Sequence, residues 1–424
     1  MRTILQEIVS YTYLTDPSFS LIRNEIVIMQ TSVKNILWSG LILFSTLAHG
    51  QYLNEESLGD TLDYSLLINP FIQIESTEAI NSMYNFEFQK AQSHFNYLQK
   101  KYPWHPLPYL LKGLNYWWQI VPNYENKRFD HDFIAYMDTT KILAENIRDN
   151  YNEIEGAFFL AAAYAFEGRL YSERREYRKA ALAGSRSLKY LGECKGHETY
   201  SPELLFGDAL FNYYAEWIRE EYPLLRPVMV FFPKGDKKLG IEQLLRVTRN
   251  AFYSRTEAQF YLMRILSSGE DRNLPEALRV GKILHEDYPD NPYFHRYYAR
   301  LLYQSGRYSD AGKESLEILE RIDQGVAGYE ANSGRYACFF LGHVNEVRRN
   351  YANAKKYYEM GLNHSKEAGA TKMGYYFYSL LHLGIIAKKE GDPVLAKEYF
   401  REVKKAAKRS HATHERARKE LKKL

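Results

Sequence analysis

The sequence predicts an all-α fold, a right-handed solenoid in which about eight helix pairs stack one on the next. Amphipathic segments with helical spacing recur along the chain, and Gly or Pro stands at their boundaries. Small residues recur at one position of the second helix of a pair, and Ala277 and Ala311 lie 34 positions apart. At 424 residues the chain is too long for one compact core, yet no stretch has the composition of a flexible linker. An array of repeats reconciles these facts, because each unit packs only on its neighbours.

Residues 29–50 have the three parts of a cleaved secretory signal. Lys34 supplies a short basic region, residues 36–47 form an apolar core too short to span a bilayer, and small residues precede a cut at Gln51. We therefore expect residues 1–28 to come from an upstream start codon and to be absent from the mature protein. This pattern predicts export to the periplasm or outer membrane of a Gram-negative bacterium. The alternative is that residues 36–47 form a helix of the folded protein.

The first helix pairs follow a mixed stretch, residues 51–75, which we expect to be a loosely ordered lead-in. Residues 76–101 have the spacing of one helix pair, and Pro103 ends it. Gly113 falls where the next first helix needs a small residue. A further unit covers residues 154–191, where runs of small residues allow two helices to pack closely.

The later repeats keep the same position for their small residue. After Ala311 the equivalent residues are Ala354 and Ala396, which are 43 and 42 positions further on. The extra residues fall in 324–334 and 363–373, so helices or connections lengthen there without losing the pattern.

One irregular stretch, residues 221–237, interrupts the repeats. Its three prolines forbid a regular helix, while its apolar residues are too many for a free surface loop. It therefore either braces or plugs the solenoid itself or presents an apolar face to a partner or a membrane. The step at Gly235 and Asp236 is expected to begin the next helix.

The plan of the repeat is clearest in residues 375–408. Gly391 ends an apolar helical run, because glycine tolerates a positive φ, and Asp392 can cap the following helix with Pro393 at its first position. This helix-turn-helix unit resembles the tetratricopeptide (TPR) repeat, whose period is 34 residues. The residues that carry the resemblance are Leu380, Leu383, Gly384, Gly391, Ala396 and Phe400.

The resemblance implies a TPR-like solenoid over residues 76–409. Within it, residues 206–244 look like a segment of bacterial TPR proteins of unassigned function. The same segment is faintly similar to the TPR-like family of mitochondrial outer-membrane protein 39 and inclusion-clearance proteins. Neither family implies catalytic residues.

The C-terminal tail is basic, with 13 Lys and Arg against 6 Asp and Glu over residues 388–424. Because acidic residues are interspersed, we interpret residues 410–424 as a basic capping helix, and we expect no nucleic-acid partner.

Enzymatic chemistry is not indicated, since the sequence holds no GxSxG, P-loop, GxGxxG or HExxH motif. His411 and His414 have helical spacing for a shared metal, but no suitable third ligand accompanies them. His285 beside Glu286 would point to different helix faces. The two cysteines, Cys194 and Cys338, form no CxxC pair, and one disulfide is the most they allow. We therefore predict a non-enzyme with no cofactor and no metal.

We expect a scaffold that binds a protein or peptide in the concave groove lined by first helices. The alternatives are a carbohydrate-binding protein that uses aromatic platforms, motivated by 37 tyrosines, and peripheral membrane docking through residues 221–237. The candidate contacts form three clusters of aromatic or basic residues on three first helices: Tyr116, Trp117, Trp118; Tyr213, Tyr214, Trp217; and Arg296, Tyr297, Arg300.

Overall fold

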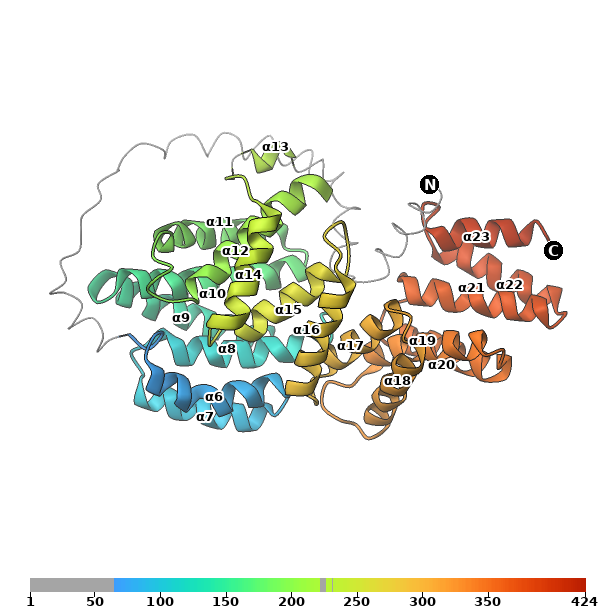
Figure 1. Cartoon of the computed structure of the whole chain (residues 1–424), viewed down its shortest axis with the longest axis horizontal. Helices are drawn as coiled ribbons and strands as arrows, with labels where there is room; N and C mark the ends of the chain where they lie inside the picture. Colours follow the sequence, from blue (N-terminus) through green and yellow to red (C-terminus); the bar gives the residue numbers. More distant parts are fainter. Residues whose placement is uncertain (1–64, 222–225, 231) are drawn as a thin grey trace.

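The computed structural model describes residues 65–221, 226–230 and 232–424 (Figure 1). Throughout these residues the regular secondary structure is helical, as predicted. The predicted upstream extension (1–28), the predicted signal peptide (29–50) and most of the predicted lead-in (51–64) lie outside the described residues.

Helices follow one another along the chain, and each packs against its neighbours in sequence. The N-terminal group comprises α6 (Pro70–Tyr84), α7 (Phe88–Lys101), α8 (Pro106–Ile120), α9 (Asp130–Asn150), α10 (Glu153–Glu173), α11 (Tyr177–Cys194), α12 (Leu204–Glu221), α13 (Arg226–Met229), α14 (Lys237–Asn250), α15 (Arg255–Leu266) and α16 (Leu274–Asp287). The C-terminal group comprises α17 (Pro292–Gln304), α18 (Tyr308–Asp323), α19 (Ala331–Val347), α20 (Tyr351–Glu367), α21 (Gly374–Lys389), α22 (Pro393–Ala406) and α23 (Ala412–Leu421). This consecutive packing fits an α-solenoid.

The first described helix begins earlier than the sequence predicted. The Asn69 side chain accepts hydrogen bonds from the backbone N–H groups of Phe71 (3.0 Å) and Ile72, and Pro70 takes the first helical position. Residues 70–75 therefore belong to α6, and the predicted loose lead-in is wrong for them. The signal was an Asn-Pro step, which serves as a helix start as readily as a turn.

The predicted seam residues do lie between helices. Ala277, Ala311, Ala354 and Ala396 are completely buried, and they stand in α16, α18, α20 and α22 respectively. The turn before α22 also matches the prediction. Gly391 has a φ of 83°, and the Asp392 side chain accepts a hydrogen bond of 2.9 Å from the Leu395 N–H.

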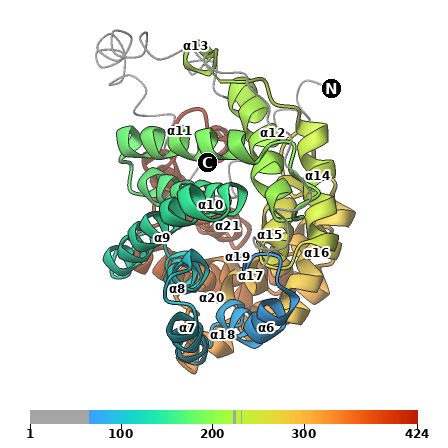
Figure 2. The same cartoon turned by 90° about the vertical axis from the view of Figure 1, so that its left-hand side faces the viewer.

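The N-terminal helices follow a curve that brings the first of them into contact with helices much later in the chain. In the end-on view of Figure 2, α6 comes to lie beside α16 and α17. The rings of Tyr84 and Tyr288 are 5.3 Å apart, and the Asn291 side-chain amide donates a hydrogen bond of 2.8 Å to the Tyr84 carbonyl. The loop after α8 closes the same turn, because the Pro122 carbonyl accepts a hydrogen bond of 2.8 Å from Asn332. Side chains from both ends of the turn therefore share the interior.

The described part of the irregular stretch braces the end of α12. The Arg219 guanidinium donates hydrogen bonds to the carbonyls of Met229 (2.9 Å), Phe232 (2.9 Å) and Pro233 (3.1 Å). Met229 is 9% exposed, whereas Val230 is 77% exposed. Asp236 then caps α14 by accepting from the N–H groups of the next turn, as the Gly-Asp step predicted.

Among the described helices, none is both long enough and apolar enough to cross a lipid bilayer.

Candidate functional site

The structure divides the nine predicted contacts into two groups. Six are buried, which is incompatible with direct contact to a partner: Trp117, Trp118, Tyr213, Arg296, Tyr297 and Arg300. Three are partly exposed: Tyr116, Tyr214 and Trp217. The prediction of partner contacts in the concave groove is therefore wrong for the six buried residues, because the closed turn of helices covers them.

The two tryptophans of α8 are buried against different sets of helices. Trp117 packs toward the following helices, with its ring 5.6 Å from Phe133 and 5.8 Å from Phe166. Trp118 packs across the closed turn, with its ring 5.2 Å from Phe294. Consecutive aromatics cannot share one helix face, so both become buried only because α8 is covered from two directions. Tyr116 stays half-buried.

The other four buried residues also have structural roles. The Tyr213 hydroxyl donates a hydrogen bond of 3.1 Å to Asp271. The Arg296 guanidinium donates one of 3.0 Å to the Pro122 carbonyl and lies 4.7 Å from the centre of the Tyr293 ring. Arg300 lies 4.9 Å from the Tyr297 ring. These contacts hold successive helices together, so these side chains stabilise the fold.

The partly exposed residues of α12 belong to a larger surface, which we call the aromatic row and define as Phe206, Tyr214, Trp217 and Tyr261. All four are half-buried and lie on α12 and α15. Ring centres are separated by 5.9 Å between Tyr214 and Trp217, 6.2 Å between Tyr214 and Tyr261, and 6.0 Å between Phe206 and Tyr261. The sequence identified two of the four; Phe206 and Tyr261 were missed because their proximity depends on how α12 packs relative to α15.

A cation lies beside Tyr261, in the middle of the aromatic row. The Arg169 guanidinium of α10 lies 5.2 Å from the centre of the Tyr261 ring and donates hydrogen bonds to the hydroxyls of Tyr261 and Tyr124. Arginine over an aromatic ring is attracted to the ring face, which fixes the guanidinium in place. The row thus combines four aromatic rings with one positioned positive charge.

A carboxylate that sequence analysis did not identify lies inside the closed turn. Glu257 on α15 is 3% exposed and accepts hydrogen bonds from the Trp118 indole N–H (2.9 Å) and the Tyr84 hydroxyl (3.4 Å). Burial raises the pKa of Glu257 to about 7, although nearby Arg169 opposes the shift. This side chain joins α6 and α8 to α15.

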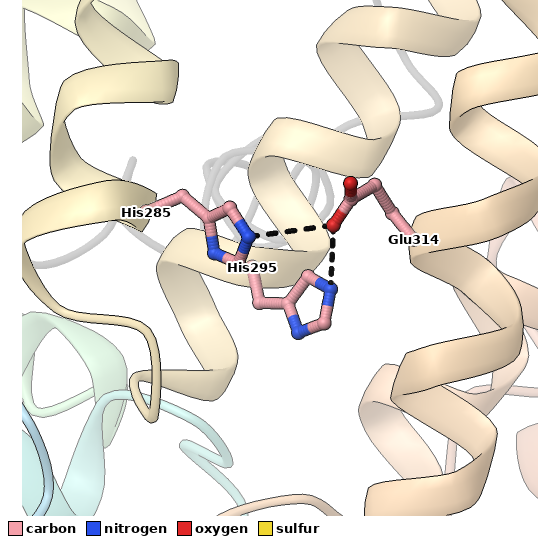
Figure 3. A group of neighbouring side chains, drawn as sticks. All are labelled: His285, His295 and Glu314. Atoms are coloured by element: carbon pink, nitrogen blue, oxygen red, sulfur yellow. Dashed lines mark hydrogen bonds and ion pairs between the residues drawn. The ribbon is translucent and has the colours of Figure 1, made fainter.

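Three side chains from three successive helices converge near α17 (Figure 3). His285 comes from the end of α16, His295 from the first turn of α17 and Glu314 from α18. Glu314 Oε2 lies 3.3 Å from His285 Nε2 and 3.0 Å from His295 Nε2. The two imidazole rings stack, with their centres 4.5 Å apart. We call this group the His-His-Glu cluster.

Burial and hydrogen bonding set the charges of the His-His-Glu cluster. Burial alone would raise the pKa of Glu314, but hydrogen bonds from His285 and His295 lower it to about 2. Burial lowers the pKa of His295, whose side chain is completely enclosed. At neutral pH the cluster therefore contains an ionised Glu314 beside a neutral His295.

The sequence prediction for these histidines was incomplete. As predicted, His285 does not pair with the adjacent Glu286. It contacts Glu314 instead, which is too distant in sequence for a motif to reveal. His411 lies outside α23, where its side chain accepts from the Thr413 N–H and its ring packs 5.1 Å from Phe377. The spacing had suggested that His411 and His414 share a helical face, and the structure shows that they do not.

The cysteines are free and buried, and burial raises the pKa of both thiols, Cys194 and Cys338, to about 12. Neither is a reactive thiolate.

No family model matches the sequence, and no curated protein matches it. Function is therefore inferred from the residues themselves.

Proposed function

We propose that the protein is a non-enzymatic scaffold, a right-handed TPR-like solenoid that binds a protein or peptide partner through the aromatic row. The observation that supports the proposal is the gathering of Phe206, Tyr214, Trp217 and Tyr261, all half-buried, on neighbouring first helices. Tyrosine and tryptophan dominate the binding energy of protein interfaces, because their large rings are held in place at low entropic cost.

Arg169 packs against one ring of this surface. Its guanidinium is fixed beside Tyr261 by the ring and by two tyrosine hydroxyls. The guanidinium also lies 5.3 Å from the ring of Trp117 and 5.7 Å from that of Phe260, which are both buried, so it supports the row from the interior. We therefore propose an apolar peptide segment, whose side chains pack on the four rings, as the partner chemistry.

Tagged full-length protein, crosslinked in native cells and captured, tests this function. The double substitution Tyr214→Ala and Trp217→Ala should weaken partner binding by roughly 800-fold, because each of the two lost anchors costs about 2 kcal/mol when it is a hot spot. Tyr213 is unsuitable for this test, since its contact with Asp271 makes it part of the fold.

Tyr97→Ala is the matched control, because Tyr97 is a 54% exposed tyrosine on α7, away from the aromatic row. It should leave capture unchanged. Equal capture by the double variant and the control would remove the aromatic row as the binding surface.

Glycan binding is the second candidate, because exposed faces of tyrosine and tryptophan rings also stack on sugars. A glycan array separates the two functions. Binding to sugars that depends on Trp217, with no captured protein, would favour the glycan function.

We further propose that the mature protein is exported, on the strength of the three-part pattern in residues 29–50. Mass spectrometry of the purified native protein should find Gln51 at its N-terminus. Peptides from residues 3–23 in that sample would contradict export by this signal.

A further inference from the structure

The His-His-Glu cluster is separate from the aromatic row, and nothing in the proposed scaffold function uses it. Its three ligating groups, two imidazoles and one carboxylate, all lie within 4.8 Å of one another. Each comes from a different helix, so the fold brings them together only when α16, α17 and α18 pack as they do.

We propose that His285, His295 and Glu314 form a binding site for one divalent transition-metal ion, with Zn²⁺ the ion that fits the ligands best. Two imidazoles and a carboxylate are a ligand set that zinc accepts with a fourth position left for water. Ca²⁺ and Mg²⁺ are disfavoured, because both prefer oxygen ligands alone.

The spacing of the ligand atoms suits a tetrahedral ion. With metal-ligand bonds of about 2.0–2.1 Å, the ligand atoms of a tetrahedron are separated by about 3.3 Å. The measured separations of Glu314 Oε2 from His285 Nε2 and His295 Nε2 are 3.3 Å and 3.0 Å. An ion can therefore enter with small side-chain movements, and it replaces the hydrogen bonds between these atoms with coordination bonds.

Hydrogen bonds from the Nδ1 side of the His295 ring support its role as a metal ligand. His295 Nδ1 lies 2.9 Å from the Tyr329 hydroxyl, which lies 3.4 Å from the Pro289 carbonyl. Without a metal, His295 Nε2–H donates to Glu314; when an ion displaces that proton, Nδ1–H donates to Tyr329 and the tyrosine to Pro289, so that the Nε2 lone pair faces the ion. Such outer partners orient ligating histidines in metal sites.

The site is also reachable from solvent. The side chains of His285 and Glu314 are 15% and 22% exposed, whereas His295 is enclosed. Water can occupy the fourth position on the exposed side.

Metal binding here would join two neighbouring helix pairs. His285 belongs to α16, while His295 and Glu314 belong to the next two helices. The link stands beside Tyr288 and Asn291, which make the contacts that close the turn. A bound ion would therefore stabilise that closure and raise the melting temperature.

The test is Zn²⁺ titration of full-length protein that has been stripped with a chelator, read by competition with a chromogenic chelator and by the melting temperature. The wild type should bind one Zn²⁺ per chain and melt several degrees higher with the ion. His285→Ala and Glu314→Gln should each weaken Zn²⁺ binding by more than about 100-fold, and Tyr329→Phe by about 10-fold to 100-fold. Both ligand positions are partly exposed, so these variants should fold.

His382→Ala is the matched control. His382 Nδ1 lies 2.7 Å from Glu346 Oε2, so this variant loses a comparable histidine-carboxylate contact elsewhere. It should keep Zn²⁺ affinity and the Zn²⁺-dependent melting shift. Absence of stoichiometric binding by the wild type, or equal binding by wild type and His285→Ala, would overturn the proposal.

Discussion

Glu257 illustrates how one buried residue links distant helices and makes stability depend on pH. Its carboxyl group accepts from Trp118 and Tyr84 in an interior that raises its pKa to about 7. The folded protein therefore holds this proton more tightly than the unfolded chain, in which the pKa is about 4.5. The stability contributed by this group is fully present below about pH 4.5 and is lost as the pH rises through about 7.

Glu257→Gln should remove this pH dependence while keeping an oxygen that accepts both hydrogen bonds. Between pH 5 and pH 8, the free energy of unfolding of the wild type should fall relative to the variant by roughly 2 kcal/mol. Urea unfolding of both proteins across this range measures the difference. Parallel pH profiles for the two proteins would show that Glu257 is not protonated in the folded state.

Sequence analysis did not find Glu257, since a lone Glu in a helix resembles any surface Glu until its surroundings are known. Glu314 and His295 were missed for the same reason. Patterns in a sequence report which side of a helix faces inward, but they do not report which distant side chains meet there.

At the scale of helices, the missing side chain of a glycine allows close packing at some positions and has no such role at others. A Cβ at Gly384 would lie 2.6 Å from the Phe400 ring, so the predicted close approach of α21 and α22 depends on it. Gly184 belongs to the small residues of the unit 154–191, but a Cβ there meets nothing within 4 Å. The close approach of α10 and α11 instead depends on Gly168, whose Cβ position lies 3.5 Å from the Gly184 backbone N.

These two glycines give a matched pair of substitutions. Gly384→Ala should destabilise the protein by about 1–3 kcal/mol, because Phe400 must move. Gly184→Ala should be neutral or stabilising by up to about 1 kcal/mol, because alanine has the higher helix propensity. Thermal and urea unfolding of the two variants measures both effects, and a loss of similar size at both positions would contradict this assignment of the seam.

Helix boundaries and seams were the most predictable features of this chain. Asp392, Gly391 and the alanine positions follow from local chemistry, because caps and close contacts need particular residue types. The start of α6 at Pro70 was missed, since its cap was interpreted as part of a loose segment.

For the whole molecule, the decisive feature is the contact of α6 and α8 with α15, α16 and α17. The contacts that close this turn join residues far apart in sequence, such as Trp118 with Phe294 and Tyr84 with Asn291. No local pattern encodes them, so the predicted open groove included residues that are buried between successive parts of the solenoid.

Trp118 should therefore act as a core residue of the closure and not as a ligand contact. Trp118→Ala should cost about 3–5 kcal/mol of stability and increase amide exchange in both α6 and α16, on the two sides of the closure. Trp217→Ala, at the half-buried aromatic row, should cost about 1 kcal/mol. Hydrogen exchange by mass spectrometry tests this, and an increase confined to α7, α8 and α9 would contradict the closure.

Site-specific photocrosslinking in cells is the sharpest test of whether the partner binds at the aromatic row. A benzophenone amino acid replaces Tyr214 in one protein and Tyr97 in another. We expect a discrete crosslinked partner from position 214 and none from position 97. No crosslink at position 214, or the same products from both positions, would contradict binding at the aromatic row.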